Sequence, residues 1–454
     1  MSMEITTVIE LIQVLLVYLS CCFFIPHIVL NKHLKGKILS ERFLLCLIIS
    51  NFYIINIVFI IFLFHLPKNR MMFSLLTIIP AAVAWQRINR PNIRHFFALI
   101  SVSFSRLMLG EAKIRTIWGA LSARPRIVIR NLFRSIIQHL KKHIVEWCLY
   151  LFLMGYNIWY YSYGSIHKYI YGASDIVVHH LWIHQMDDGN IFSNGIYPFG
   201  FHNVIFFMHR IFGLRIVSIL RTFGTVEALF IFSMIYVLLR KLCHSKIIPL
   251  LGIYFFTIPN FYNFQGTMRY QWALPQEYAI LFLYPCAYFL IQYFERKRKE
   301  LNTEKLMLEK NLLYTWLPKY HLLPSTRSLI FFGISFSLTL AVHFYITIIA
   351  VLLCFAIAIA YLPTVLHYRY FFSIALAGLL SICVAVLPML VGYAEGHGLE
   401  GSLYWAMSVM SPEDQTTDEN PESEDTETEN DEEKSADGKS TETERSGGEI
   451  KNAG

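Results

Sequence analysis

The chain has 454 residues, of which 55% are hydrophobic, 15% aromatic and 16% charged. Soluble domains carry about 45–50% apolar and about 25% charged residues, so this composition excludes an ordinary soluble protein and indicates an integral membrane protein. The net charge of +7 combines a basic N-terminal part with an acidic C-terminal tail.

Apolar segments along the chain predict an all-α integral membrane fold. A hydrocarbon core of about 30 Å requires about 20 apolar residues per helix. Segments near this length predict about ten transmembrane helices, two of them within 328–362, separated near His343. The others are 5–30, 43–66, 72–85, 145–164, 216–239, 247–259, 278–294 and 371–393.

The lysines and arginines between these segments predict the orientation of the chain. They concentrate in 32–42, 86–144, 240–246 and 295–299. Because cytoplasmic loops of membrane proteins carry the excess of basic residues, we place these connections in the cytoplasm. The alternate connections, at 165–215, 260–277, the turn at His343 and the tail, then lie outside. We therefore expect a multi-pass membrane protein with these connections in the cytoplasm.

The basic segment 86–144 contains a predicted amphipathic helix. Its apolar residues recur at helical spacing and basic residues occupy the opposite side: Ile129, Leu132, Phe133, Ile136, Ile137 and Leu140 against Arg130, Arg134, Lys141 and Lys142. An apolar stripe with cationic flanks is typical of a helix in the membrane interface. We expect membrane lipids as its partner, and no nucleic acid.

The tail 411–454 has a different composition from the rest of the chain. It holds 16 Asp and Glu against 4 Lys and Arg, with almost no apolar side chains. Such a segment cannot bury enough surface to fold, so we predict disorder. The expected organisation is an N-terminal three-helix segment (1–85), the basic segment (86–144), a membrane core (145–410) and the tail.

Ionisable residues are densest between Asp175 and Asp188, within the predicted outer connection. Three histidines (His179, His180, His184) and three aspartates share fourteen residues. In a helix, residues four apart lie on one face, as Asp175 with His179 and His180 with His184 would. Imidazole and carboxylate groups at this spacing can share a divalent metal, for which Asp175, His180, His184 and Asp187 are the candidate ligands. Helix capping and lipid-headgroup contacts are the alternative roles.

The residues that follow predict a shaped loop and a second helix. Segment 190–202 interleaves Gly195, Pro198 and Gly200 with aromatic residues, which is typical of a structured turn at the membrane interface. Apolar residues then recur from Val204 to Phe212 at helical spacing, which predicts an amphipathic helix. A helix, a turn and a helix would form a cover over a site.

This arrangement resembles the first outer loop of the GT-C superfamily of membrane glycosyltransferases. The resemblance rests on Asp175, His179, His180 and the loop ending at Pro198, after the first strongly hydrophobic span that follows a cytoplasmic segment. It covers roughly residues 145–410 and implies transfer of a sugar from a polyprenyl-phosphate carrier at the outer face of a bacterial plasma membrane. It further implies that Asp175 is the general base or a metal ligand, with His179 and His180 beside the substrate.

Three further residues are candidates for substrate binding. Arg269, in the second predicted outer connection, could clamp a lipid phosphate bidentately, or anchor an aromatic belt at the interface. Arg221, near the outer end of its span, is a second candidate for the phosphate, because intramembrane charges are costly unless paired or facing a polar cavity. His343 lies where GT-C proteins often carry a polar residue, and could equally be a hydrogen-bonded turn residue.

Two other functions fit the same sequence. A carrier or flippase would place ionisable groups near the midplane and usually shows repeated halves. Here the titratable groups concentrate at one edge and we see no internal repeat, but Arg221 and Glu227 lie within a span and keep this function open. A non-catalytic membrane scaffold would use the outer connection and tail to bind partners. The sugar, the acceptor and any protein partner stay open at this stage.

Overall fold

The computed structural model describes residues 3–66, 68–89, 101–102, 104–110, 119, 123–167, 175–243, 245–261, 272–309, 323–366, 368–401 and 404. Of these residues, 87% are helical and none lies in a β-strand, which confirms the all-α prediction. The chain from Met1 to Leu403 forms one compact unit. Arg269 and the tail 411–454 lie outside the described residues.

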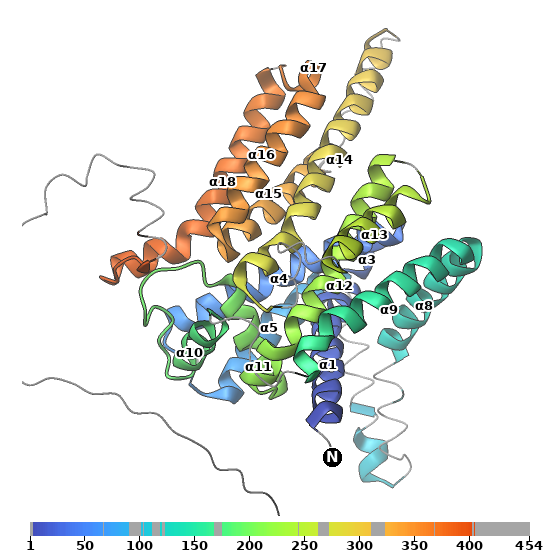
Figure 1. Ribbon diagram of the computed structural model, residues 1–454. Coiled ribbons are helices and arrows are strands. Elements are labelled where there is room, and N and C mark those ends of the chain that lie inside the picture. The colour runs from blue at the N-terminus through green and yellow to red at the C-terminus, as the bar shows by residue number, and fades with distance from the viewer. Residues whose placement is uncertain are drawn as a thin grey trace, which may run out of the picture. The chain divides into compact units, whose positions relative to one another are not determined.

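The helices are labelled in Figure 1. The N-terminal ones are α1 (Met3–Leu19), which continues through a π-helical turn (Ser20–Phe24) into α2 (Ile25–Val29), then α3 (Asn31–Leu34), α4 (Leu39–Leu63) and α5 (Arg70–Asn89). The middle ones are α8 (Ala123–Lys142), α9 (Ile144–His167), α10 (Asp175–Asp187), α11 (Gly200–Phe212), α12 (Ile216–Cys243) and α13 (Ile248–Phe261). The C-terminal ones are α14 (Pro275–Glu309), α15 (Pro324–Val342), α16 (Phe344–Ala360), α17 (Leu362–Val365) and α18 (Tyr368–Ala394).

Each of the predicted spans corresponds to a helix, but not every helix qualifies as a span. Six segments of the described chain are long and apolar enough to cross a membrane: Met3–Val29, Leu39–Leu63, Arg70–Asn89, Ile216–Cys243, Pro324–Val342 and Tyr370–Ala394. Helices α13 and α16 are shorter, and α9 and α14 are not among the six. The structure therefore supports a membrane protein, while the total of ten spans stays a prediction.

Burial distinguishes the central helices from the peripheral ones. In α4 and α12, 67% of the most apolar window is buried, against 11% in α5 and α18. The exposed apolar surface of α5 and α18 is suited to lipid contact. At the centre, the hydroxyl groups of Tyr18 and Tyr278 lie 3.1 Å apart, and Tyr278 also donates to the Asn51 side chain, so these buried polar groups satisfy one another.

The helices α14, α15, α16 and α18 run side by side (Figure 1). As the sequence predicted, the apolar run around 340 is two helices, because His343 is extended (φ −161°, ψ 125°) between α15 and α16. The backbone N–H of Ile196 donates to the Gly398 carbonyl (2.8 Å), which joins two connections that we predict to be outside. An ion pair of Lys241 with Glu295 joins two that we predict to be cytoplasmic.

Two further predicted helices differ in outcome. The predicted amphipathic stripe forms α8, where Leu132 is buried and the Phe133 ring stacks at 6.4 Å on Phe24 of the first span. Helix α11 forms as predicted and has the expected amphipathic pattern, but it is buried more completely than a helix at the membrane interface would be: its first nine residues, Gly200 to Met208, are all buried. The reason is its position, because α4, α5, α12, α14 and α15 all contact it.

Candidate functional site

Helix α10 separates the predicted site residues into two environments. One face packs inward and contains Ile176, His179, Trp182, Ile183 and Met186. The other face is exposed and contains Asp175, Val177, Val178, Leu181 and His184, with His180 half-buried. The predicted i, i+4 pair Asp175 and His179 is therefore divided, with the carboxylate at the rim and the imidazole beneath it.

His179 is joined to a second buried histidine on α11. Its Nδ1 lies 3.0 Å from Nε2 of His202, and both side chains are buried. Burial lowers the pKa of His179 to about 4, against the opposing charge of Asp175, and lowers the pKa of His202 well below its ordinary value, with His179 adding to the effect. Both rings are therefore neutral at pH 7, and one N–H donates to the other ring.

Tyr197 lies at the centre of the predicted site. Its ring centroid is 5.4 Å from that of Trp182, 6.0 Å from His202 and 6.4 Å from His343. Burial raises the pKa of the Tyr197 phenol, and the carboxylates that raise it further are Glu400, Glu277 and Asp175. Rings from α10, α11 and the α15–α16 junction therefore lie around one phenol, and carboxylates on α10, on α14 and after α18 act on it electrostatically.

Two glycines allow the loop before α11 to adopt its path. Gly195 has φ +95°, a left-handed conformation that favours glycine, and an added Cβ would lie 2.9 Å from the backbone nitrogen of Glu400. Gly200 begins α11 against α15, where an added Cβ would lie 2.6 Å from the Ala341 carbonyl oxygen. The cover formed by α10, the loop and α11 is thus fixed by close backbone contact to α15 and to residues 398–400.

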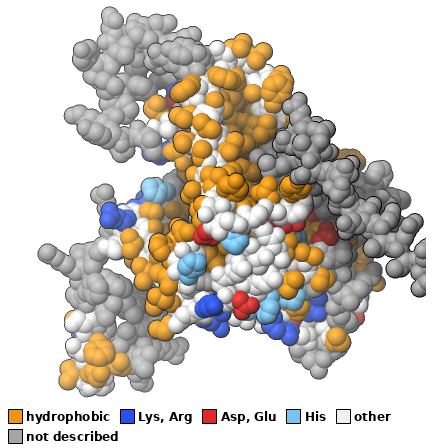
Figure 2. Space-filling model, turned by 90° about the vertical axis from the view of Figure 1, so that its left-hand side faces the viewer, with side chains coloured by type: hydrophobic (Ala, Val, Ile, Leu, Met, Phe, Trp, Pro, Cys, Tyr) orange, Lys and Arg blue, Asp and Glu red, His pale blue; other side chains and the backbone are white. Residues whose placement is uncertain are grey.

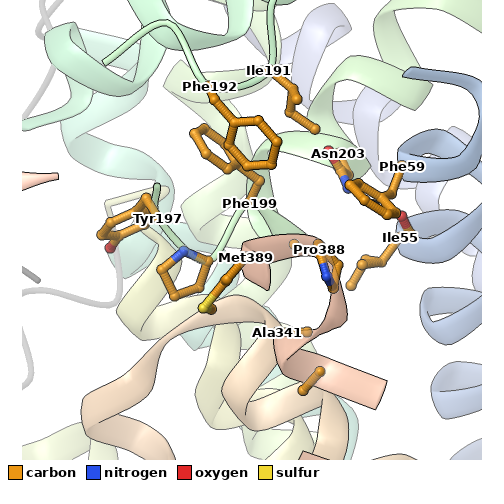
Figure 3. A pocket seen from close by; sticks show the side chains of 13 residues that line it. Ile55, Phe59, Ile191, Phe192, Tyr197, Phe199, Asn203, Ala341, Pro388 and Met389 are labelled. Carbon is orange, nitrogen blue, oxygen red and sulfur yellow. The ribbon is translucent and has the colours of Figure 1, made fainter. Parts of the chain in front are cut away.

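The cavity under this loop is small (Figure 3). Its volume is about 20 Å³, with Phe192 and Phe199 from the loop, Asn203 from α11 and Pro388 and Met389 from α18 among its lining residues. That volume holds about one water molecule and is too small for a sugar. Oδ1 of Asn203 is buried without a hydrogen-bond partner among the described residues, so a water there would satisfy it.

A substrate would therefore approach from the exposed side of α10. Figure 2 shows the face on the side of α10 and α18: hydrophobic side chains cover its upper part, and ionisable side chains gather below them. Val177, Val178 and Leu181 are 56%, 46% and 53% exposed, next to exposed Asp175 and His184.

The candidate metal ligands are not arranged as one group. Among the described residues, no three histidine, cysteine, aspartate or glutamate side chains are placed to hold a metal ion. Asp187 instead contacts α11, with its carboxylate 3.4 Å from both His209 Nε2 and Arg210 Nη1. Burial by itself raises the pKa of the Asp187 carboxyl. The hydrogen bond with His209 and the positive charges of His209 and Arg210 outweigh burial, so the pKa of Asp187 is lowered. The metal site at Asp175, His180, His184 and Asp187 stays a prediction, and no step below uses a metal.

Of the two predicted phosphate-binding arginines, the structure describes only Arg221. Arg221 forms an ion pair with Glu10 of α1, and the same carboxylate accepts hydrogen bonds from Arg215 (2.6 Å) and Ser218 (2.8 Å). A phosphate would have to compete with Glu10 for Arg221, so its assignment to a donor phosphate stays a prediction. The assignment of Arg269 also stays a prediction, since that residue is outside the described chain.

Sequence reasoning missed Tyr197, His202, Glu277 and Glu400 as members of this cluster. The turn-rich composition of 190–202 indicated a structured loop, but no spacing in the sequence relates it to residues 277 or 400. Comparison with known proteins adds no assignment, because no protein-family model, curated protein or solved structure matches the chain.

Proposed function

We propose that the protein is a membrane glycosyltransferase that moves a sugar from a polyprenyl-phosphate carrier to an acceptor hydroxyl at the outer face. The observation that carries the proposal is the convergence around Tyr197. The sequence selected His343 separately from the pair Asp175 and His179; the rings of His179 and His343 lie near this phenol, and the Asp175 carboxylate acts on it electrostatically. A set of titratable groups brought together from distant segments at one edge of a membrane protein supports a chemical function there.

In the proposed reaction, Asp175 is the general base. Its carboxylate takes the proton of the acceptor hydroxyl while the hydroxyl oxygen forms a bond to the anomeric carbon. The bond from that carbon to the phosphate oxygen breaks on the opposite side, and its electrons leave with the lipid phosphate. His180 and His184 are available at the surface of α10 for sugar hydroxyl groups, while the neutral His179–His202 pair positions the helix that carries Asp175.

The test is sugar transfer by the purified full chain in lipid nanodiscs, with a panel of radiolabelled polyprenyl-phosphate sugars. We expect Asp175→Asn to lower turnover by about 10²–10⁴-fold, the usual contribution of a general base. Asp188→Asn is the matched control, because Asp188 is an exposed carboxylate just after the other end of α10, and it should keep wild-type turnover. Equal turnover by Asp175→Asn and wild type would reject Asp175, and no turnover with any donor would reject the proposed activity.

A proton-coupled carrier is the second candidate, and one specific observation favours it. Glu227 in α12 is fully buried, and neither carboxylate oxygen has a hydrogen-bond partner among the described residues. It lies close enough to Glu277 to interact with it electrostatically. A carboxyl group buried in a membrane span is costly, and such groups commonly carry protons in transporters. If the protein is a carrier, Glu227→Gln should therefore abolish proton uptake by proteoliposomes. It should leave sugar transfer intact if the protein is an enzyme.

A further inference from the structure

A basic pocket lies at the end of α15 opposite to His343. Its volume is about 480 Å³, and its lining comes from the α3–α4 connection, from α14 and from α15. The ionisable lining residues are Lys32, His33, Lys35, Lys37, Glu41, Arg296 and Arg327. Five cations thus face one carboxylate, and three separate segments of the chain contribute them.

The single carboxylate in this pocket, Glu41, already forms ion pairs with two of the cations. Glu41 Oε1 lies 2.5 Å from Lys37 Nζ and 3.3 Å from Arg296 Nη2. The side chains of Lys32, Lys35 and Arg327 form no ion pair or hydrogen bond with any described residue, and all three are exposed. The pocket therefore presents uncompensated positive charge in a concave site, which favours an anion.

An apolar groove begins beside the pocket. It has a volume of about 400 Å³ and lies between α15 and α18, with one residue, Phe52, from α4. Arg327 in the pocket is adjacent in sequence to Thr326 in the groove, and Ile330 in the groove lies one helical turn further along α15. Ile330, Leu376 and Leu380 are 46%, 44% and 56% exposed, so the groove opens to the membrane rather than to the core.

We propose that the pocket and the groove together bind an anionic phospholipid, with its phosphate among Lys32, Lys35 and Arg327 and an acyl chain along α15 and α18. Charge complementarity selects an anionic headgroup, and the apolar groove next to it selects a lipid over a soluble phosphate. The pocket lies on the side that we predict to be cytoplasmic, where the leaflet carries anionic lipids and basic pockets between helices bind their headgroups. The proposal is independent of sugar transfer, because the site is at the other end of α15 from Tyr197.

The experiment measures lipid binding to the purified full chain in detergent, by native mass spectrometry. Phosphatidylglycerol is compared with phosphatidylcholine of the same acyl chains. We expect the triple variant Lys32→Gln/Lys35→Gln/Arg327→Gln to bind phosphatidylglycerol roughly 100-fold more weakly, from about fivefold per cation. The matched control removes three exposed cations from other connections that we predict to be cytoplasmic (Lys246→Gln/Arg298→Gln/Lys299→Gln); none of them lines the pocket or the groove, so this variant should keep wild-type affinity.

Two further arms separate the headgroup from the chain. Leu376→Trp fills the groove and leaves the basic pocket intact, so it should weaken phosphatidylglycerol binding. If the triple variant does not fold, Leu376→Trp tests the proposal in its place. Soluble glycerol 3-phosphate should bind far more weakly than the lipid. The proposal is overturned if phosphatidylcholine or glycerol 3-phosphate binds as tightly as phosphatidylglycerol. It is also overturned if the Lys246/Arg298/Lys299 control loses as much affinity as the triple variant, or if Leu376→Trp binds normally.

Discussion

The two ends of the helical unit differ in whether their charged side chains are paired with opposite charges. At the end that carries α10 and α11, the buried and half-buried ionisable groups named above are paired or neutral: Glu10 with Arg215 and Arg221, Asp187 with His209 and Arg210, and His179 with His202. At the other end of α15, Lys32, Lys35 and Arg327 converge without a compensating carboxylate among the described residues. Pairing fixes one end in a single arrangement, whereas unpaired cations leave the other able to bind an anion.

The largest expected effect is the loss of Glu10, since its side chain is 8% exposed and Arg221 is only 15% exposed. Glu10→Ala leaves buried positive charge uncompensated, so we expect a loss of about 3 kcal/mol in the free energy of unfolding. Glu4→Ala on the same helix should cost less than about 0.5 kcal/mol, because Glu4 and its partner His167 are exposed. Detergent-induced unfolding of purified variants measures both.

The double variant Glu10→Ala/Arg221→Ala sharpens this result. If the cost arises from an unpaired charge, removing Arg221 as well should restore part of the lost stability. A double variant as unstable as the sum of the single ones would show instead that Glu10 and Arg221 act independently, and the two ends would then not differ in the way described.

The second prediction concerns pH, and it tests whether the His179–His202 pair is neutral. The pKa of His179 is lowered to about 4, and that of His202 further, mainly by burial. A lowered histidine pKa means that stability is full above about pH 6.5 and is lost as the pH falls toward 4. The loss should reach about 1.4 kcal/mol per pH unit for each histidine.

The opposite sign applies to His209, whose pKa is raised chiefly by its hydrogen bond to Asp187. Its contribution is present below about pH 6.5 and is lost at higher pH, so it partly offsets the effect. Unfolding at pH 7, 6 and 5, with His179→Phe/His202→Phe as the comparison, separates the two. We expect the double variant to lose the acid instability; equal stability of the wild type at pH 7 and 5 would contradict a neutral pair.

The helices could be predicted from the sequence, but the contacts between helices could not. Apolar runs of about 20 residues predicted the spans, and the polar His343 within 328–362 predicted the break, because both signals are local. The pairing of His179 with His202, or of Glu10 with Arg221, depends on which helices are neighbours, and hydropathy does not encode that. The period of α11 predicted its amphipathic pattern but not its depth, because a helix contacted by seven others is buried on more than its apolar side.

The third prediction tests the close contact that holds the cover on α15. Gly200→Ala places a Cβ 2.6 Å from the Ala341 carbonyl oxygen, and backbone cannot move aside cheaply, so we expect a loss of about 1–3 kcal/mol. Gly378→Ala in α18 is the matched control, because no atom lies within 4 Å of its added Cβ. The control should be neutral or slightly stabilising, since alanine favours helix more than glycine does. A Gly200→Ala protein as stable as the control would mean that α11 is not held tightly against α15.

The smallest effect is expected for the bridge between α10 and α11. Asp187→Asn removes the charge that faces His209 and Arg210, and we expect a loss of about 1 kcal/mol at pH 6. The loss should shrink at pH 8, where His209 is less protonated, but not vanish, because Arg210 keeps its charge. Asp188→Asn, one residue further and exposed, should change stability at neither pH. If Asp187→Asn costs the same at both pH values, the arginine alone holds the bridge, and the proposed role of His209 in closing this end is rejected.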